Sequence, residues 1–239
     1  MLFYRSNINY LKKYIKKDKK VIFNFLNMYS LYLYNTNKLF YNSINNKNNF
    51  NFIDGFPISA YLSIINFKKV KRIQGPYFFE QILSDNYFKK KKHFLLGNLG
   101  EKEVSLISKK FNILIKNISY YNPPFIKDTI KFNKNEISKM SKKINASKCD
   151  YLWIGIGNPK QEILANDLFN IVKVKFIFNV GAGFDFISNK KKHAPKFIQK
   201  IGFEWFYRLV TDFKHSFKKV INSIKGFIFI FSLKLKDFK

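Results

Sequence analysis

The sequence predicts an α/β fold: a mostly parallel sheet with helices on both faces, Rossmann-like, followed by a basic, helical C-terminal appendage. Short, continuous apolar runs alternate with longer segments of mixed composition, and such runs are typical of strands covered on both faces. Alternating strands and helices favour a parallel sheet with right-handed crossovers. After residue 189 the apolar spacing becomes helix-like, and no further strand is expected.

Six apolar runs are expected to be strands, and five segments between them to be helices. The Asn-rich stretch 35–51 has low complexity, which a general compositional drift toward Asn also produces. The pattern divides the chain into a basic N-terminal segment (1–20), an α/β domain (21–188) and the basic appendage (189–239). The expected strands are 21–26, 49–53, 93–97, 112–118, 150–155 and 175–180, and the expected helices lie near 57–66, 76–88, 100–111, 134–147 and 159–169.

The charge of the chain is strongly positive and unevenly distributed. Its 239 residues carry 44 Lys and Arg against 15 Asp and Glu, a formal net charge of +29, of which residues 1–20 contribute +6 and residues 189–239 contribute +10. Basic ends fit a polyanion or an anionic membrane surface. A drift toward AT-rich codons, which raises the Lys and Asn content of solvated termini, gives the same distribution of charge. Because this drift also explains the 19% aromatic content, and no RNP-like or zinc motif occurs, we do not expect a nucleic-acid partner.

Several structural classes are excluded by residue counts. The single cysteine, Cys149, rules out a disulfide framework and a Cys-based zinc site. Three scattered histidines leave little for a His-ligated metal. No apolar run approaches the roughly 18–20 residues that cross a bilayer, and the N-terminus lacks the apolar core of a signal peptide. We therefore expect a cytoplasmic protein.

Glycine, arginine and acidic residues are scarce, so their positions are informative. Glycines end or follow four of the apolar runs, at positions 55, 97, 155 and 181. Ligands of open parallel sheets bind beyond the carboxyl ends of the strands, where glycine permits close backbone approach; making a turn is the alternative role. Arg72 and Arg208 each offer a planar fork for phosphate or carboxylate. A structural ion pair is the alternative, for example Arg208 with Glu204 one helical turn earlier.

Two aspartates stand at strand exits, Asp54 before Gly55 and Asp185 within the segment GAGFDF. A partly desolvated carboxylate in such a place can act as a general base. It can equally cap a helix or close a turn.

The segment GIGNPKQE (155–162) follows an apolar run and opens a predicted helix. Pro159 is placed near the first helical position, which proline favours, and Lys160 and Gln161 in the first turn. Free amides behind a Gly-rich loop form an anion site. The spacing is neither G-x-G-x-x-G nor a Walker A loop, which weakens the alternative of a nucleotide-binding oxidoreductase. No D-x-D motif is present, so a nucleotide diphosphate would be held by amides, Lys and Arg.

Together these segments resemble the WecG/TagA/CpsF family of bacterial glycosyltransferases. The most specific likeness lies in GIGNPKQE (155–162), VGAGFDF (180–186) and HAPKFIQKIGFEWFYRL (193–209), which match the family pattern in order and spacing. The resemblance covers about residues 21–220. Weaker upstream matches stand in the right order: FIDGFPIS (52–59), RIQG (72–75), FLLG (94–97) and NPPF (122–125).

The resemblance implies transfer of an N-acetylmannosamine-type sugar from a UDP-sugar to a sugar on a polyprenyl diphosphate, at the cytoplasmic face of the membrane. It implies inversion, no metal, no cofactor and a peripheral membrane location, and it is compatible with a homo-oligomer. Asp54 falls on the catalytic base of the family. The implied donor-binding residues are Asn27, Gly55, Arg72, Gly75, Gly97, Gly157, Asn158, Pro159, Lys160, Gln161, Glu162 and Asp185, and the implied acceptor-diphosphate and membrane residues are Arg208, His215, Lys218 and Lys219.

The chain departs from the family pattern at four places. The threonine of an early T-x-N motif is replaced by Phe25, with Ser30 as the nearby hydroxyl. The segment after Arg72 lacks an aspartate and has Pro76 and Tyr77 instead. His193 replaces an arginine, and His215, Lys218 and Lys219 replace the arginines of the appendage. Lysine keeps the charge of arginine but loses its bidentate geometry.

Overall fold

The computed structural model describes Ile15 and residues 19–127, 129–188, 194–195, 197–198, 204–211 and 213–233. Within these residues the chain forms one six-stranded sheet of order β2-β1-β6-β5-β3-β4. All paired strands are parallel, which confirms the predicted α/β class. The strands are β1 (Val21–Leu26), β2 (Asn49–Ile53), β3 (His93–Gly97), β4 (Ile118–Tyr121), β5 (Tyr151–Gly155) and β6 (Phe176–Asn179).

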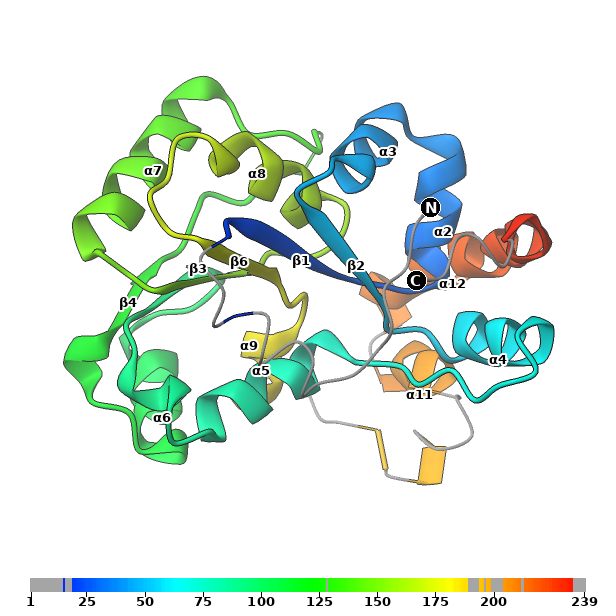
Figure 1. The fold of residues 1–239 in the computed structure, drawn as a ribbon, viewed down its shortest axis with the longest axis horizontal. Coiled ribbons are helices and arrows are strands. Elements are labelled where there is room, and N and C mark those ends of the chain that lie inside the picture. The colour runs from blue at the N-terminus through cyan, green and yellow to red at the C-terminus, as the bar shows by residue number, and fades with distance from the viewer. Residues whose placement is uncertain are drawn as a thin grey trace.

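Helices cover both faces of the sheet, with α3, α7 and α8 on one side and α5, α6 and α9 on the other (Figure 1). The described helices are α2 (Met28–Thr36), α3 (Lys38–Asn45), α4 (Phe56–Ile65), α5 (Gly75–Ser84), α6 (Glu101–Phe111), α7 (Lys134–Ser147), α8 (Lys160–Phe169), α9 (Gly183–Ile187), α11 (Glu204–Thr211) and α12 (Phe213–Gly226), with short 3-10 turns η1 (Phe88–Lys90), η2 (Ile115–Asn117) and η3 (Phe227–Ser232).

Alternate residues of each strand fill two different cores. On one face, the rings of Phe23, Phe178 and Trp153 stack across three neighbouring strands, with centroid separations of 4.8 and 4.4 Å. On the opposite face, Ile22 and Ile177 pack in a cluster with residues of α7 and α8. Because both faces are covered, the strands carry continuous apolar runs, and this is why the runs predicted five of the six strands well.

Buried asparagines tie together the strands at the β2 edge. Asn24 on β1 donates from Nδ2 to the Oδ1 atoms of Asn49 and Asn51 on β2, both at 2.9 Å. Asn179 on β6 donates to Oδ1 of Asn24 at 2.7 Å. These hydrogen bonds between buried amides favour one register of the strands over its neighbours. The Asn-rich composition therefore has a structural use here.

One expected strand is wrong, and two helices were not among the expected ones. The strand expected at 112–118 is instead the end of α6 and the turn η2, and β4 begins only at Ile118. Asn112 adopts a left-handed conformation that ends α6, and the amide of Ile113 bonds back to the carbonyl of Ser108. Helices α2 and α3 lie between β1 and β2, where the sequence analysis named no helix. Asn27 and Asn37 act as their N-caps, a role that asparagine performs well.

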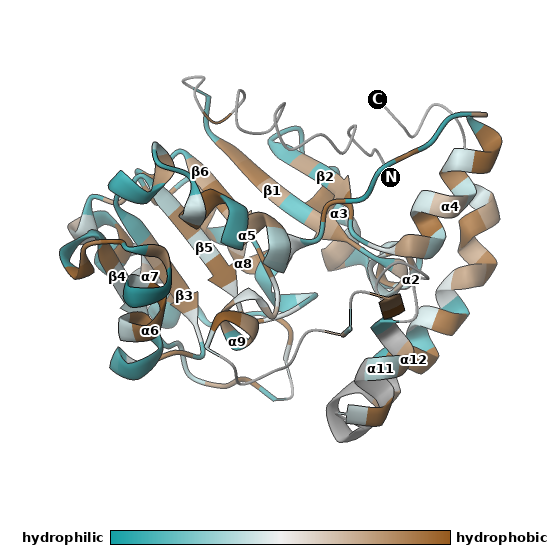
Figure 2. Cartoon of the chain, turned by 90° about the horizontal axis from the view of Figure 1, so that it is seen from below, coloured by the Kyte–Doolittle hydropathy of each residue, from teal (hydrophilic) through white to brown (hydrophobic). Residues whose placement is uncertain are grey.

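The described part of the appendage is helical, as expected, and packs beside α2 and α4 at the β2 edge of the sheet (Figure 2). Ile230 and Leu233 are buried in the same cluster as Leu31 and Leu62 of those two helices. No helix within the described ranges is long and apolar enough to cross a membrane. The basic segment 1–20 lies largely outside the described residues.

Gly226, the last residue of α12, packs closely against α2, and Gly226→Ala is expected to destabilise the protein. An added Cβ would lie 2.5 Å from the carbonyl oxygen of Met28, a backbone atom. This clash should outweigh the gain of about 1 kcal/mol that alanine brings to a helix. Overpacking costs about 1–3 kcal/mol, so the melting temperature should fall by several degrees in a circular-dichroism melt. Gly100→Ala is the control, because its added Cβ meets only the Glu103 carboxylate at 3.5 Å. An unchanged or higher melting temperature for Gly226→Ala would show that the crossing is loose.

Candidate active site

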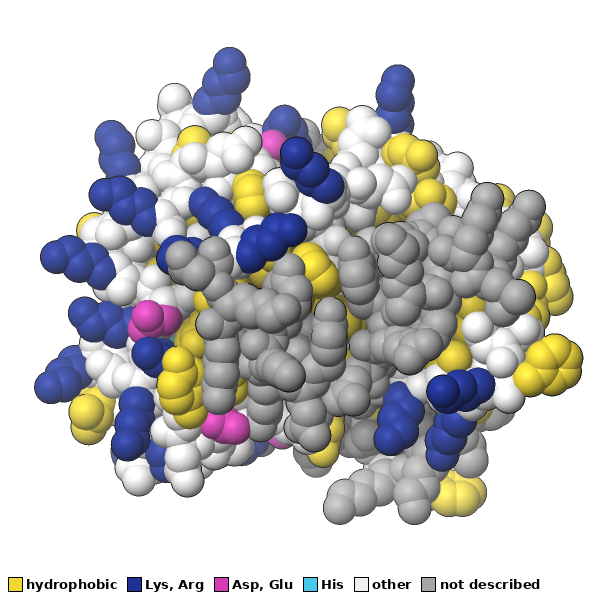
Figure 3. Space-filling view, in the orientation of Figure 1, with side chains coloured by type: hydrophobic (Ala, Val, Ile, Leu, Met, Phe, Trp, Pro, Cys, Tyr) yellow, Lys and Arg dark blue, Asp and Glu magenta, His cyan; other side chains and the backbone are white. Residues whose placement is uncertain are grey.

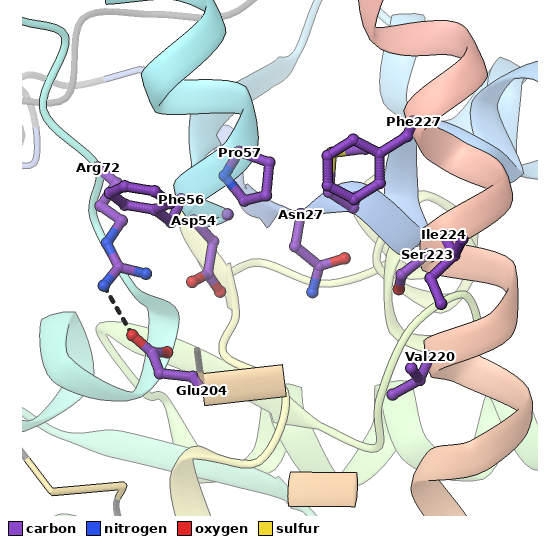
Figure 4. A pocket seen from close by; sticks show the side chains of 12 residues that line it. Asn27, Asp54, Phe56, Pro57, Arg72, Glu204, Val220, Ser223, Ile224 and Phe227 are labelled. Atoms are coloured by element: carbon purple, nitrogen blue, oxygen red, sulfur yellow. Dashed lines mark hydrogen bonds and ion pairs between the residues drawn. The ribbon is translucent and has the colours of Figure 1, made fainter. Parts of the chain in front are cut away.

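A pocket of about 150 Å³ opens at the carboxyl ends of β1 and β2, below the appendage (Figure 4). Its polar side carries two carboxylates, a guanidinium and an amide, and its apolar side is formed largely by α12 and the first residue of η3. The lining residues are Asn27, Met28, Asp54, Gly55, Phe56, Pro57, Arg72, Glu204, Val220, Ser223, Ile224 and Phe227. The appendage thus supplies one wall of a pocket whose floor belongs to the sheet.

The ends of β1 and β2 hold Asn27 and Asp54 side by side. The amides of Asp54 and Gly55 both bond to the carbonyl of Leu26, at 2.9 and 3.4 Å. A Cβ on Gly55 would lie 3.2 Å from Cα of Asn27, so glycine allows the two loops to approach closely. Asn27 caps α2 by accepting from the amide of Ser30 at 3.2 Å. In Figure 4 the Asp54 carboxylate points into the pocket.

Arg72 enters the pocket paired with an acid from the appendage. Its Nη2 donates to Oε1 of Glu204 at 2.7 Å, and Nε2 of Gln74 donates to Oε2 of the same carboxylate at 2.6 Å. The two paired side chains are only 20% and 17% exposed. The ion-pair alternative considered for Arg72 is therefore present, although with a partner that the sequence did not indicate. The side chain of Arg208, the alternative partner of Glu204, lies outside the described residues.

The GIGNPKQE segment forms a turn that touches the same pocket wall. Asn158 donates from Nδ2 to Oγ of Ser30 at 2.8 Å, and Ser30 in turn bonds to Asn27. The Asn158–Pro159 peptide is cis, and Pro159 is the N-cap residue, so α8 begins at Lys160 rather than at the proline. The turn is thereby joined to the lining of the pocket through a chain of three polar side chains.

Lys160 and Gln161 have structural partners in this turn. The ammonium of Lys160 contacts the carbonyl of Ile126 and lies 5.1 Å from the ring centroid of Phe125, which fixes the loop before α7. Gln161 is buried, accepts from the amide of Gly181 at 3.1 Å and donates to Oε1 of Glu162 at 2.9 Å. Gln161 therefore links the loops that follow β5 and β6. A direct contact of either side chain with a ligand stays a prediction.

Glu162 is a fully buried acid beneath this turn. Burial raises the pKa of its carboxyl to about 7, and the positive charge of Lys219 opposes that rise. Oε2 of Glu162 has no hydrogen-bond partner among the described residues, whereas Oε1 accepts from Gln161. Because its pKa is raised to about 7, this carboxyl is partly neutral near pH 7. Its contact with the turn is the hydrogen bond from Gln161.

Gln161→Ala is expected to weaken UDP binding by about tenfold. The substitution removes the hydrogen bond that the half-buried amide of Gly181 donates to Oε1 of Gln161, and a polar group left unpaired away from water costs about 1–3 kcal/mol. Isothermal calorimetry with UDP measures the effect. Gln81→Ala, on α5, is the matched control and should bind UDP like the wild type. Unchanged affinity of Gln161→Ala would move the donor site away from this turn.

The strand-end glycines serve two different purposes. A Cβ on Gly97 or Gly155 would come within 2.8 or 2.6 Å of the Phe184 ring, so these two glycines make room for an aromatic side chain. Gly75 similarly packs against Phe25. In contrast, Gly157 has a φ of +86°, and the nearest atom to its Cβ position beyond its chain neighbours is Nζ of Lys219, 3.9 Å away. Of the glycines predicted to contact a ligand, Gly157 thus has the least crowded surroundings, and its nearest neighbour is a positively charged side chain.

A comparison with models of known protein families identifies the family of this chain. The family model described as "Glycosyl transferase WecG/TagA/CpsF family" matches residues 3–238. The chain belongs to this family.

Three curated relatives are named N-acetylglucosaminyldiphosphoundecaprenol N-acetyl-beta-D-mannosaminyltransferase. That of Bacillus subtilis (strain 168) is 25% identical over 175 residues, which are 72% of this chain and 64% of the relative. That of Staphylococcus aureus (strain MRSA252) is 29% identical over 60% of this chain and 54% of the relative. That of Bacillus spizizenii is 25% identical over 66% of this chain and 59% of the relative. The matches thus span just over half to just under two thirds of the relatives' own length.

The family motifs lie at two neighbouring places in the structure. Asp54, Gly55 and Arg72 line the pocket, and the 155–162 turn adjoins it. Lys219 reaches the turn from α12, with its Nζ 3.9 Å from the Cβ position of Gly157. Asp185 lies in the first turn of α9 and is not in the pocket lining.

Other predicted residues could not be placed at the site. Arg208 belongs to α11, and His215 and Lys218 to α12, but their side chains lie outside the described residues, as does His193. Within the described part of the chain, no cluster of three or more His, Cys, Asp or Glu side chains is positioned to hold a metal ion.

Sequence reasoning missed most of the wall formed by the appendage. Glu204 was considered only as a partner of Arg208, and Val220, Ile224 and Phe227 were not considered as pocket residues. The scarcity of acids, 15 in a chain with 44 basic residues, was a signal that could have identified Glu204. The apolar residues of α12 carry no comparable signal, because their spacing is that of any packed helix.

Proposed function

We propose that this chain is an inverting glycosyltransferase that moves a HexNAc-type, ManNAc-like sugar from a UDP-sugar to a sugar on a polyprenyl diphosphate. The observation that carries the proposal is that the Asp54 carboxylate and the Arg72 guanidinium line one pocket at the carboxyl ends of two parallel strands. Family membership and the names of the relatives support this choice of reaction, which belongs to the synthesis of cell-surface polysaccharide.

In the proposed reaction Asp54 accepts the proton of the acceptor hydroxyl. The hydroxyl oxygen then bonds to the anomeric carbon on the face opposite the leaving group, the bond from that carbon to the diphosphate breaks, and UDP departs. A single displacement inverts the anomeric configuration. A positioned base contributes about 10²–10⁴ to such a rate.

Positive groups around the pocket are proposed to stabilise the departing diphosphate. Arg72 lines the pocket, Lys219 lies near the Gly157 turn, and α8 begins at Lys160 directly after that turn. Arg208, His215 and Lys218 are proposed to meet the acceptor diphosphate from the appendage. Because these groups can neutralise a diphosphate, we propose that transfer proceeds without a metal ion.

The proposed acceptor places the protein on the inner face of the cell membrane. The appendage carries a net charge of +10 over residues 189–239, and each basic residue near an anionic leaflet contributes roughly 1 kcal/mol to binding. We therefore propose a peripheral protein that meets its lipid-linked acceptor at the membrane surface.

The test is a transfer assay with a panel of UDP-HexNAc donors and a short-chain GlcNAc-diphosphate-lipid acceptor. The expected result is release of UDP and formation of a β-linked disaccharide from one donor, with activity largely retained in EDTA. A strict requirement for Mg²⁺ or Mn²⁺ would contradict the metal-free mechanism. Stabilisation by NAD and not by UDP in a thermal-shift assay would favour an oxidoreductase instead.

A further inference from the structure

Phe67, two residues after the end of α4, combines an exposed side chain with an unusual backbone conformation. Its side chain is 99% exposed, and its φ is +49°. The amide of Phe67 bonds to the carbonyl of Ile64, and the amide of Lys68 bonds to that of Ser63, which together form a Schellman motif. The left-handed position of this motif favours Gly or Asn, and a bulky residue there is a genuine outlier. The fold thus holds a large aromatic ring in water at an energetic cost.

Exposed apolar side chains, here called the apolar patch, lie near Phe67 in sequence on α4, and on η3, which α4 meets. Ile64 on α4 is 71% exposed, and Ile228 and Phe231 on η3 are 74% and 76% exposed. The rings of Tyr61 and Phe231 meet edge to face with centroids 5.7 Å apart, which joins α4 to η3. Hydrophobic side chains project at the right-hand edge of Figure 3, where Figure 1 places the end of α4 and the red C-terminal segment.

The surroundings of this patch are basic. Lys68, Lys69 and Lys71 follow Phe67 and are exposed, as is Lys225 before η3. Neither of the segments 56–71 and 213–233 contains an acidic residue. Apolar side chains rimmed by lysines are complementary to an anionic bilayer surface. A second copy of the chain fits less well, because a symmetric contact would bring two lysine rims together.

Helix α4 and the turn η3 each contribute residues to both the patch and the pocket. α4 begins at the pocket wall with Phe56 and Pro57, and its ten residues rise about 15 Å to the turn with Phe67. Phe227 lines the pocket, and Ile228 is the next residue. A surface that rested on the patch would therefore lie about one short helix away from Asp54.

We propose that Ile64, Phe67, Ile228 and Phe231 form one membrane-contact surface, in which the turn after α4 inserts Phe67 among anionic phospholipids beside the appendage. The inference rests on the proposed function, because a lipid-linked acceptor requires an enzyme at the membrane. It extends that function by assigning half of the contact to the α/β body. The surface sets the height of the pocket above the lipid and so presents the acceptor sugar to Asp54.

The test is cosedimentation with vesicles of phosphatidylglycerol and phosphatidylcholine, measured without substrates. Phe67→Asn should lower the partition coefficient about tenfold, since a large apolar ring is lost. Its melting temperature should be equal to or above that of the wild type, because Asn tolerates the left-handed conformation. Leu114→Asn, at an exposed apolar site before β4, is the control and should bind vesicles like the wild type.

Phe67→Asn that binds vesicles as tightly as the wild type would overturn the inference. So would a change from dimer to monomer in sedimentation velocity without a change in vesicle binding, since the patch would then be a self-association surface. Lys68→Gln with Lys69→Gln should weaken binding several-fold at low salt and less at high salt. Failure of sugar transfer on every acceptor, with vesicle binding still dependent on Phe67, would reject the proposed function alone.

Discussion

Asp54→Asn is expected to lower turnover by a factor of about 10²–10⁴ while leaving the fold and UDP binding intact. Asparagine has nearly the same shape, and the backbone bond from residue 54 to Leu26 does not depend on the side chain. The carboxylate is the group proposed to take the acceptor proton, and an amide cannot do so. Steady-state kinetics with saturating donor and acceptor measures the effect on kcat.

Two controls separate loss of the base from other effects of Asp54→Asn. Calorimetry with UDP should give an unchanged Kd, and Asp85→Asn, in the turn after α5, should keep full turnover. If kcat of Asp54→Asn stays within a few-fold of the wild type, Asp54 is not the base. The remaining pocket acid, Glu204, would then be the next residue to test.

The part of the site that lies on strand ends could be predicted from the sequence. Buried parallel strands leave continuous apolar runs, so the residue after each run identifies the carboxyl edge where ligands bind. Asp54 was found in this way, and Arg72 because arginine is rare in this chain. The pairing of Arg72 with Glu204 could not be found, because it joins residues 132 positions apart and leaves no local pattern.

Glycines and asparagines show why local patterns also mislead. Gly97 and Gly155 stand where a ligand could approach, but their lack of a side chain makes room for Phe184, which lies in a later element. The Asn-rich stretch was attributed to composition, yet Asn37 caps α3 and Asn49 and Asn51 bond across the sheet. The role of each of these residues depends on a partner that only the fold brings near.

The wall formed by α12 is a further feature that emerged only in three dimensions. Val220, Ile224 and Phe227 are spaced as on any amphipathic helix, and the same spacing fits a helix that packs on the body or one that lies on a membrane. In the structure, α12 and η3 pack on the body through Val220 and Ile230, which are buried. Ile228 and Phe231 remain exposed. Packing of the appendage on the body is therefore compatible with contact between the appendage and a membrane, because the two use different faces of the appendage.

Arg72→Ala is expected to lower kcat/KM by about 100-fold. A hydrogen bond to a charged group contributes about 1.5–3 kcal/mol, and a departing diphosphate needs positive charge next to it. The loss should be larger than that of one contact, because Glu204 would keep its negative charge in the pocket without the partner 2.7 Å away. Arg72→Lys keeps the charge but loses the planar fork, so a loss of about tenfold is expected.

The double variant Arg72→Ala with Glu204→Gln separates the two contributions to the loss predicted for Arg72→Ala. Removing the unpaired carboxylate should restore about a factor of ten in kcat/KM, and the remaining deficit measures what Arg72 itself gives to the diphosphate. Glu204→Gln alone should reduce kcat/KM only several-fold, since Gln74 can still bond to the side chain at position 204. The steady-state assay with donor and acceptor varied separately provides all four values, and their thermodynamic cycle gives the coupling energy. A fall of less than threefold for Arg72→Ala would mean that the Arg72–Glu204 pair only fastens the appendage to the body and that the diphosphate is held by the turn at Gly157.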